Sequence, residues 1–212
     1  MLKIWGRATS FNVQKVMWAV SELGLEHSRV DVGGEFGGND TPEYLAMNPN
    51  GLVPVVQDGD LTLWESHTCV RYISARYGMG RLCPEDLAER ASAERWMDWY
   101  QSRVHADWGI MFAGLVRTPP SKRDMACIDA AVQRLGTSLQ ILEQHLAGRE
   151  YIAGDELTIA DIPLGASLFR YYELRVERPS MPNIDAWYQR LQARVSYVEH
   201  AMVSFEGLRA TD

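Results

Sequence analysis

The hydrophobic pattern of this chain changes after residue 78, and that change limits the folds that the chain can adopt. Before residue 78, short apolar runs alternate with segments whose apolar residues recur at the helical spacing. After it, strand-like runs fade and only the helical spacing remains. The sequence therefore predicts an α/β domain at residues 1–78, a linker containing Gly and Pro at 79–86, and an all-helical domain at 87–212.

The α/β part is expected to follow the element order βαβαββα. Its first strand, helix and strand form a unit that pairs the two strands in parallel. Asp58-Gly59 between the last two strands is a hairpin signal, because such a turn places both central residues at positive φ. The expected strands are Leu2–Trp5, His27–Val32, Val55–Gln57 and Asp60–Trp64, and the expected helices are Phe11–Leu23, Pro42–Met47 and Ser66–Tyr77.

The remaining residues predict helices only. One of them begins with a capping signal, in which the Thr158 side chain accepts from the amide of Asp161 and the Asp161 carboxylate reaches back to Thr158. Pro163 conflicts mildly with this helix, because proline removes one helical donor. The expected helices are Leu87–Val116, Lys122–Leu146, Asp161–Glu173 and Ile184–Val195.

Composition excludes several classes of partner. The formal net charge of −7 argues against nucleic acid, because phosphate binding needs a clustered excess of Lys and Arg. No apolar run reaches the roughly 18 residues that a membrane helix needs, and Met1–Trp5 lacks the apolar stretch of a signal peptide. Cys69, Cys83 and Cys127 form no CxxC pair and no disulfide framework, so we expect a cytoplasmic protein.

Two short motifs predict a site for a small peptide that carries a carboxylate. In the segment Met47–Val56, a Val-Pro step precedes an apolar strand, and a turn containing proline can free backbone hydrogen-bonding groups there. Glu65-Ser66 places a carboxylate and a hydroxyl at the start of a helix, where free amides and the helix dipole favour an anion. The simpler alternatives are a trans proline that opens an edge strand and a plain helix cap.

Three motifs occur in the order and spacing of one known family: Asn48-Pro49 with Val53-Pro54, Glu65-Ser66, and the cap Leu157–Asp161. Over essentially its whole length the chain resembles the cytosolic glutathione transferases. The segment Ser10–Val16 is similar to the bacterial, theta-like or nu-like branches, because it carries neither a Tyr nor a Cys. The resemblance implies a thioredoxin-like first domain, glutathione as co-substrate without a further cofactor, and a homodimer.

The resemblance also implies roles for residues near the first helix. Glutathione must react as its thiolate, and a free thiol has a pKa of about 8.5. Ser10 is the first choice to donate a hydrogen bond to that sulfur, with Asn12 as partner or replacement, and the amides that start the helix add positive charge. The alternative is that Ser10 only caps the helix, as serine commonly does.

The other motifs correspond to parts of glutathione. By resemblance, Val53-Pro54 is a cis step whose Val53 backbone pairs with the cysteinyl part, and Ser66 and Glu65 bind the carboxylate and the ammonium of the γ-glutamyl end. Leu52 departs from the family pattern, since several classes place Lys, Gln or Arg there for the glycyl carboxylate. Asn39, Asn50 and Lys15 are the possible substitutes.

The electrophile should bind between the two domains, along the first helix of the second domain. Tyr100, Arg103 and Trp108 are our candidates, although an aromatic stripe is more often core than pocket. The five histidines show no metal-ligand spacing, so no metal site is expected. Gly33–Asp40 does not match a phosphate-binding loop and is expected to border the glutathione site.

The sequence therefore predicts a glutathione transferase that stabilises the thiolate for attack on a hydrophobic electrophile. One alternative is a glutathione-dependent disulfide or peroxide reductase of the same fold. Nu-like members catalyse this reduction without a protein cysteine. Another is a noncatalytic binding module, and a third is a homologue that stores hydrophobic compounds. The presence of Ser10, Val53-Pro54 and Glu65-Ser66 together argues against the noncatalytic module.

Overall fold

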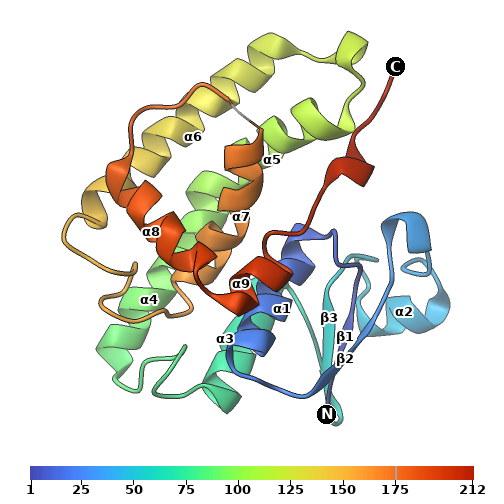
Figure 1. Cartoon of the computed structure of the whole chain (residues 1–212). Coiled ribbons are helices and arrows are strands. Elements are labelled where there is room, and N and C mark those ends of the chain that lie inside the picture. Colours follow the sequence, from blue (N-terminus) through green and yellow to red (C-terminus); the bar gives the residue numbers. More distant parts are fainter. Residues whose placement is uncertain (175) are drawn as a thin grey trace.

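A computed structural model describes residues 1–174 and 176–212 and confirms the predicted fold class, a mixed sheet with helices on its faces followed by helices only (Figure 1). The sheet has the order β2-β1-β3-β4. Strand β1 pairs in parallel with β2 and antiparallel with β3, and β4 pairs antiparallel with β3. The strands are β1 Leu2–Trp5, β2 His27–Val30, β3 Val55–Asp58 and β4 Leu61–Trp64.

Alternation along the strands divides the side chains between two faces of the sheet. Ile4 and Val56 are buried against α1 (Phe11–Glu22) and α3 (Ser66–Tyr77), which pack on one face. Their strand neighbours Trp5 and Val55 point the other way, toward the short helix α2. Figure 1 shows α1 and α3 on one side of the strands and α2, residues Pro42–Met47, on the other.

The hairpin between β3 and β4 lies one residue further along the chain than predicted. Asp58 is paired with Leu61, so the two turn residues are Gly59 and Asp60. Only Gly59 has a positive φ, of 58°. A turn with glycine at its first central position needs positive φ at that residue alone, which is why Asp60 fits the second position.

The second half is helical, with bounds close to those predicted. The expected helix Leu87–Val116 is present as α4 and α5, interrupted and followed by π-helical turns at Tyr100–Val104 and Ala113–Arg117. Helix α9 was not predicted, because six residues are too few to show a helical period. The helices are α4 Leu87–Trp99, α5 His105–Phe112, α6 Met125–His145, α7 Asp161–Glu173, α8 Pro182–Gln192 and α9 Val195–His200.

No helix in the described ranges is both long and apolar enough to span a membrane.

The cap before α7 differs in one detail from the prediction. Asp161 does reach back: its Oδ2 accepts from the backbone N–H of Thr158 at 2.9 Å. The Thr158 hydroxyl, however, accepts from the amide of Ala160 at 3.3 Å, and the amide of Asp161 bonds instead to the Thr158 carbonyl. The other carboxylate oxygen of Asp161 accepts from Ile152 and Trp187, each at 3.0 Å, so the cap also joins α8 to the segment before α7.

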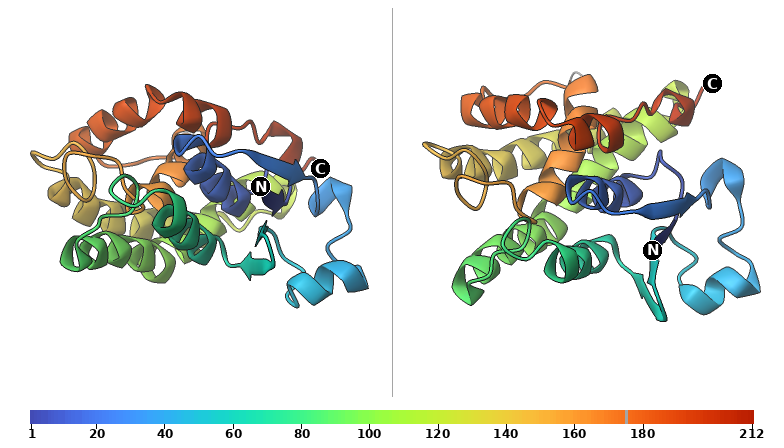
Figure 2. Two further views of the ribbon diagram at one scale, coloured as in Figure 1. Left: turned by 90° about the horizontal axis from the view of Figure 1, so that it is seen from below. Right: turned by 60° about the horizontal axis from the view of Figure 1, so that its bottom comes forward.

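Helix α1 lies between the sheet and the C-terminal helices. In both views of Figure 2, the red C-terminal helices lie close to the blue helix α1, and α7 and α9 both contact it. The buried indole of Trp18 meets the ring of Tyr197 edge-on at 4.8 Å. The Tyr197 hydroxyl in turn donates to the carbonyl of Gly165 at 2.8 Å.

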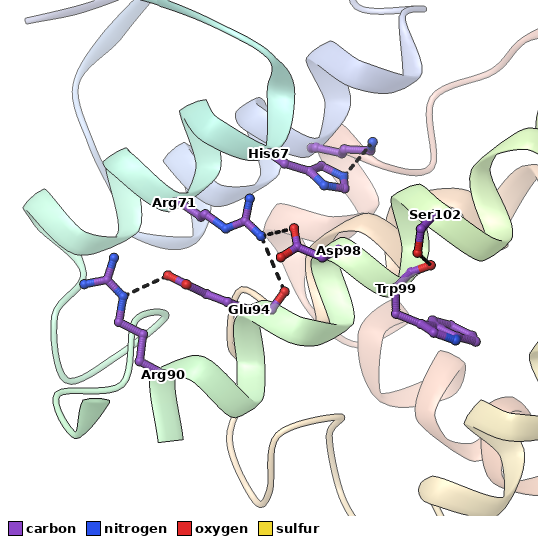
Figure 3. A network of polar contacts seen from close by, with 8 residues as sticks. His67, Arg71, Arg90, Glu94, Asp98, Trp99 and Ser102 are labelled. Atoms are coloured by element: carbon purple, nitrogen blue, oxygen red, sulfur yellow. Dashed lines mark hydrogen bonds and ion pairs between the residues drawn. The ribbon is translucent and has the colours of Figure 1, made fainter. Parts of the chain in front are cut away.

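Helices α3 and α4 make a polar contact between the two halves. Figure 3 shows Arg71 of α3 reaching α4, where it bonds to the carboxylate of Asp98 and to the carbonyl of Glu94. The segment between these helices is also packed, since the carbonyl of Leu82 accepts from the amide of Ile159 at 2.9 Å. The two halves are therefore joined by side-chain and main-chain contacts on both sides of α1.

The contact between α1 and α7 requires a glycine. A Cβ at position 165 would lie 2.8 Å from the Trp18 ring and 2.9 Å from Leu191. We expect Gly165→Ala to lower the free energy of unfolding by about 1–3 kcal/mol, because inserting a methyl group into a packed contact displaces its neighbours. Gly109→Ala in α5 is the matched control, since its Cβ would meet nothing within 4 Å.

Urea unfolding of both variants and of the wild type measures the difference. Gly109→Ala should be neutral or slightly stabilising, because alanine favours a helix over glycine. Equal stability of Gly165→Ala and the wild type would contradict close packing between α1 and α7.

Candidate active site

Five of the predicted site residues line one cavity of about 310 Å³: Ser10, Asn12, Leu52, Val53 and Trp108. The cavity lies where the N-terminus of α1 faces the turn before β3 on one side and α5 on the other. A larger hollow of about 760 Å³ lies between the segment 80–92 and residues 153–158, and it contains none of the predicted site residues. We therefore place the candidate active site in the smaller cavity.

Ser10 occupies the N-cap position of α1, but its side chain does not cap the helix. Its backbone is extended, with φ −80° and ψ 120°, and its hydroxyl accepts no hydrogen bond from the first helical amides. Its carbonyl accepts from the amide of Gln14 at 2.9 Å, which starts the helical ladder. The hydroxyl is thus left available to a ligand in the cavity, beside amides that carry partial positive charge.

Asn12 connects the start of α1 to the start of α3. Its Oδ1 accepts from the Lys15 ammonium at 3.0 Å and lies 3.4 Å from the hydroxyl of Ser66. Because the carbonyl end of the amide is used in this way, the NH₂ end is the group that Asn12 can offer to a ligand. Asn12 and Ser66, which were predicted separately, therefore belong to one polar network.

Lys15 is buried in this network, and no carboxylate of the described residues forms an ion pair with it. Besides Asn12, its ammonium lies 3.1 Å from Nε2 of His67, and it stands 4.3 Å above the ring of Phe11 and 5.0 Å from that of Tyr100. Burial lowers the pKa of Lys15 to about 7, although the charge of Glu65 opposes this shift. Burial and the nearby Lys15 lower the pKa of His67 to about 2, so the His67 ring is neutral and its Nε2 can accept a hydrogen bond from the Lys15 ammonium.

The turn before β3 has the predicted cis peptide bond between Val53 and Pro54. No backbone hydrogen bond is found for Val53 within the described ranges, so its N–H and C=O are open to a ligand. Leu52 differs, because its carbonyl already accepts from the Tyr44 hydroxyl at 2.9 Å and from the Asn48 amide at 2.8 Å. Its side chain is 64% exposed and can contribute only apolar contact.

Of the three possible substitutes for Leu52, only Asn39 lines the cavity. Its amide donates to the carbonyl of Gly51 at 2.7 Å. The Asn50 side chain donates to Asn48 instead, and Lys15 is held inside the network with Asn12.

Glu65 is the one non-glycine residue with positive φ among the described residues, at 69°. It directly precedes α3, and its carbonyl accepts from the amide of Cys69. Left-handed backbone costs a non-glycine residue free energy and often occurs at binding sites. This conformation leaves the Glu65 side chain exposed beside the buried Ser66 at the helix start.

The structure does not bring Tyr100 and Arg103 to the cavity. Tyr100 is fully buried behind Phe11, with ring centroids 6.1 Å apart, and burial raises the pKa of its hydroxyl well above the ordinary value. Arg103 is exposed in the π-helical turn. Trp108 does line the cavity and stacks on Phe11 at 4.5 Å.

Three arginines that the sequence did not single out also line the cavity: Arg7, Arg117 and Arg170. They come from the β1–α1 loop, from the end of the π-helical turn after α5, and from α7. No local pattern marks them, because their proximity arises only when the two halves of the chain pack together. The inward position of Lys15 had a weak signal, a cation among the apolar residues Val13, Val16 and Met17.

Comparison with known proteins finds similarity over almost the whole chain. A family model described as the glutathione S-transferase N-terminal domain matches residues 1–75, and one described as the C-terminal domain matches residues 105–194. Glutathione S-transferase GstB of Escherichia coli (strain K12) is 41% identical over 206 residues, covering 96% of this chain and 99% of the relative. The chain belongs to the glutathione S-transferase family.

Other glutathione S-transferases are similar in sequence or structure. Glutathione S-transferase 3 of Zea mays is 32% identical, covering 92% of this chain and 91% of the relative. The theta class glutathione S-transferase of Xanthomonas axonopodis pv. citri, solved with glutathione bound, has a TM-score of 0.92 and 44% identity and covers 96% of this chain and 98% of its own. The predicted similarity to bacterial, theta-like members is confirmed.

The lowered pKa of Lys15 predicts a pH dependence of stability in this glutathione S-transferase. The unfolded chain keeps the Lys15 proton up to about pH 10.5, whereas the folded chain releases it near pH 7. The unfolded state therefore binds more protons between these values, so the contribution of Lys15 to the free energy of unfolding rises with pH across that window. Relative to Lys15→Met, the wild type should become more stable from pH 7 to 10, by on the order of a few kcal/mol.

Urea unfolding of both proteins at several pH values measures this difference, and pH effects common to both cancel. Lys122→Met is the control, since Lys122 is exposed, and its difference from the wild type should not change with pH. A pH-independent difference for Lys15→Met would mean that the folded protein keeps Lys15 protonated throughout this range.

Proposed function

We propose that this glutathione S-transferase holds glutathione as a thiolate at Ser10 and transfers it to an electrophile bound against α5. The observation that carries this proposal is that Ser10 lines the cavity at the start of α1 while its hydroxyl makes no capping hydrogen bond. A hydrogen bond to the sulfur and the positive end of the helix both favour the charged form of the thiol. The NH₂ group of Asn12 is a second donor at the same helix start.

Glutathione would lie along the wall formed by Val53, Asn12 and the start of α3. The free backbone groups of Val53 pair with the cysteinyl unit in the manner of an added strand. Ser66 and the amides of α3 receive the γ-glutamyl carboxylate, and Glu65 receives its ammonium. The glycyl carboxylate then lies next to Leu52, and Asn39 is a side-chain amide that lines the same cavity.

Chemistry at a protein cysteine is disfavoured by the positions of the three cysteines. Cys69 and Cys83 are buried, and Cys127 is exposed on α6. Burial raises the pKa of Cys69 to about 12, which makes it a poor nucleophile. The sulfur that reacts is therefore that of glutathione, both in the transferase and in the alternative disulfide or peroxide reductase.

We also propose a homodimer, a cytoplasmic location, and functional domains at residues 1–78 and 87–212. The edge strand β4 exposes Leu61 and Trp64, and Tyr77 at the end of α3 is also exposed, which suits contact with a second copy. Three cysteines without a disulfide among the described residues fit a reducing compartment.

Steady-state kinetics with a chlorodinitrobenzene test the assignment of Ser10. Ser10→Ala should lower kcat/KM by roughly 10- to 100-fold, the loss of one hydrogen bond to a charged group. The KM for glutathione should change little, because the peptide is held elsewhere. Ser102→Ala is the matched control, since Ser102 is exposed outside the cavity and its hydroxyl donates to the carbonyl of Trp99.

The same variants assayed with a small disulfide and an organic hydroperoxide separate the two chemistries. Turnover of the disulfide far above that of the haloarene would favour the reductase. Binding of glutathione without turnover of any of these substrates would favour a noncatalytic module.

A further inference from the structure

The cavity has a second polar wall besides the expected glutathione wall, and it is formed by arginines. Arg7, Arg117 and Arg170 come from three different elements and line the same cavity of about 310 Å³. Among the described residues, none of the three forms an ion pair with a carboxylate, and no Asp or Glu lines the cavity. Three cations therefore converge on this cavity without a counter-charge from the protein.

Two of these arginines also have buried donors without a partner among residues 1–174 and 176–212. Arg170 is only 1% exposed, and its Nε, like that of Arg7, is buried without a hydrogen-bond acceptor. Buried donors are nearly always satisfied, and a buried cation without a partner is costly. Burial and the charges of Arg117 and Arg7 lower the pKa of Arg170 to about 10, which reflects this mutual repulsion.

Arg170 is held by contacts from both halves of the chain. Its Nη2 donates to the carbonyl of Thr9 at 2.8 Å, directly before Ser10. Its guanidinium lies 4.8 Å from the centre of the Phe112 ring, and that of Arg117 lies 5.6 Å from the same ring. These contacts orient the two guanidiniums while leaving charge-assisted bonds to be made.

The Gly-rich loop provides the space that Arg7 occupies. A Cβ at Gly34 would lie 2.8 Å from Nε of Arg7, and one at Gly33 would lie 3.0 Å from its Nη1. Both glycines have positive φ, of 81° and 61° for Gly33 and Gly34. Gly33 and Gly34, in the part of Gly33–Asp40 that borders the site, thus leave room for the Arg7 side chain beside the cavity.

We infer that the electrophile carries an anionic group, a carboxylate, which Arg7, Arg117 and Arg170 bind while Phe11, Trp108 and Phe112 contact its apolar part. The inference rests on the proposed transferase function and names the class of its second substrate. Trp108 and Phe112 are nearly parallel, with centroids 5.1 Å apart, so the arginines adjoin an aromatic wall. A small carboxylic acid with a leaving group on its α-carbon fits both walls.

The arginines also reduce the electrostatic repulsion between the two reactants. Glutathione loses its thiol proton to solvent, and the thiolate attacks the α-carbon of the acid. A carbon–sulfur bond forms, the carbon–halogen bond breaks, and the halide leaves with the bonding electron pair. Thiolate and carboxylate are both negative, so cations at the carboxylate reduce the repulsion as the two approach.

The other carboxylate that could bind here is the glycyl end of glutathione. The Arg7 side chain packs against the Gly-rich loop at Gly33, near Asn39. It is therefore close to the expected place of the glycyl carboxylate. Arg117 and Arg170 come instead from the helical domain and pack on Phe112, on the electrophile side. We therefore assign the anion site to the electrophile, and Arg117 is the residue that separates the two assignments.

Iodoacetate and iodoacetamide test the inference, because they share the leaving group and differ in charge. Each kcat/KM is divided by the uncatalysed rate constant with glutathione. The wild type should then favour iodoacetate. Arg117→Gln should lower kcat/KM for iodoacetate by roughly 10- to 100-fold. It should leave kcat/KM for iodoacetamide and the KM for glutathione nearly unchanged. Arg117→Lys should restore part of the loss, and Arg103→Gln, which removes an exposed charge outside the cavity, should have no effect.

Three outcomes would overturn the anion site. In the first, the wild type turns over iodoacetamide without favouring iodoacetate. In the second, Arg117→Gln lowers kcat/KM for both reagents by the same factor. In the third, Arg117→Gln raises the KM for glutathione instead. In each of these the transferase function stands. Lack of turnover of both reagents by an enzyme that turns over chlorodinitrobenzene would also overturn the anion site, whereas lack of turnover of all three would contradict the proposed function itself.

Discussion

The site depends on how the first turn of α1 is held in place. The helix is packed between the sheet, α3 and the C-terminal helices, with Trp18 seated against Gly165. The loop before it is tied down as well, since Arg170 donates to the carbonyl of Thr9 and the Gln14 side chain donates to that of Ala8 at 3.0 Å. Ser10 therefore faces the cavity from a backbone held by both halves of the chain. Its hydroxyl need not serve as the cap, because packing already fixes the helix start.

A chain with a net charge of −7 concentrates positive charge at this one place. The N-terminus of α1, the buried Lys15 and the three arginines all lie around Ser10 and Asn12. Burial makes the charge of Arg170 more effective, since less water screens it. The net charge of the chain and the charge of the side chains that line the cavity therefore have opposite signs. An anionic cavity ligand, whether thiolate or carboxylate, is stabilised by the local field despite the net charge.

The fold and half of the site follow from local sequence signals. Alternation and helical spacing predicted the strands and most helices, and the motifs around Ser10 and Val53 predicted residues that line the cavity. The hairpin was placed one residue early, because Asp58-Gly59 and Gly59-Asp60 are both acceptable turns and the strand register decides between them. The arginine wall could not be predicted, since Arg7 and Arg170 are 163 positions apart and meet only through packing. Tyr100 was assigned to the pocket because helical spacing does not show that Phe11 covers it.

The most direct test of the account is the pKa of the glutathione thiol when bound. The ultraviolet absorbance of the thiolate can be titrated against pH in the wild type, Ser10→Ala and Asn12→Ala. The account predicts that the wild-type enzyme lowers this pKa by one or more units from the free value of about 8.5, and that Ser10→Ala returns it most of the way. Bound glutathione with an unshifted thiol pKa in the wild type, or a shift that only Asn12→Ala removes, would contradict it.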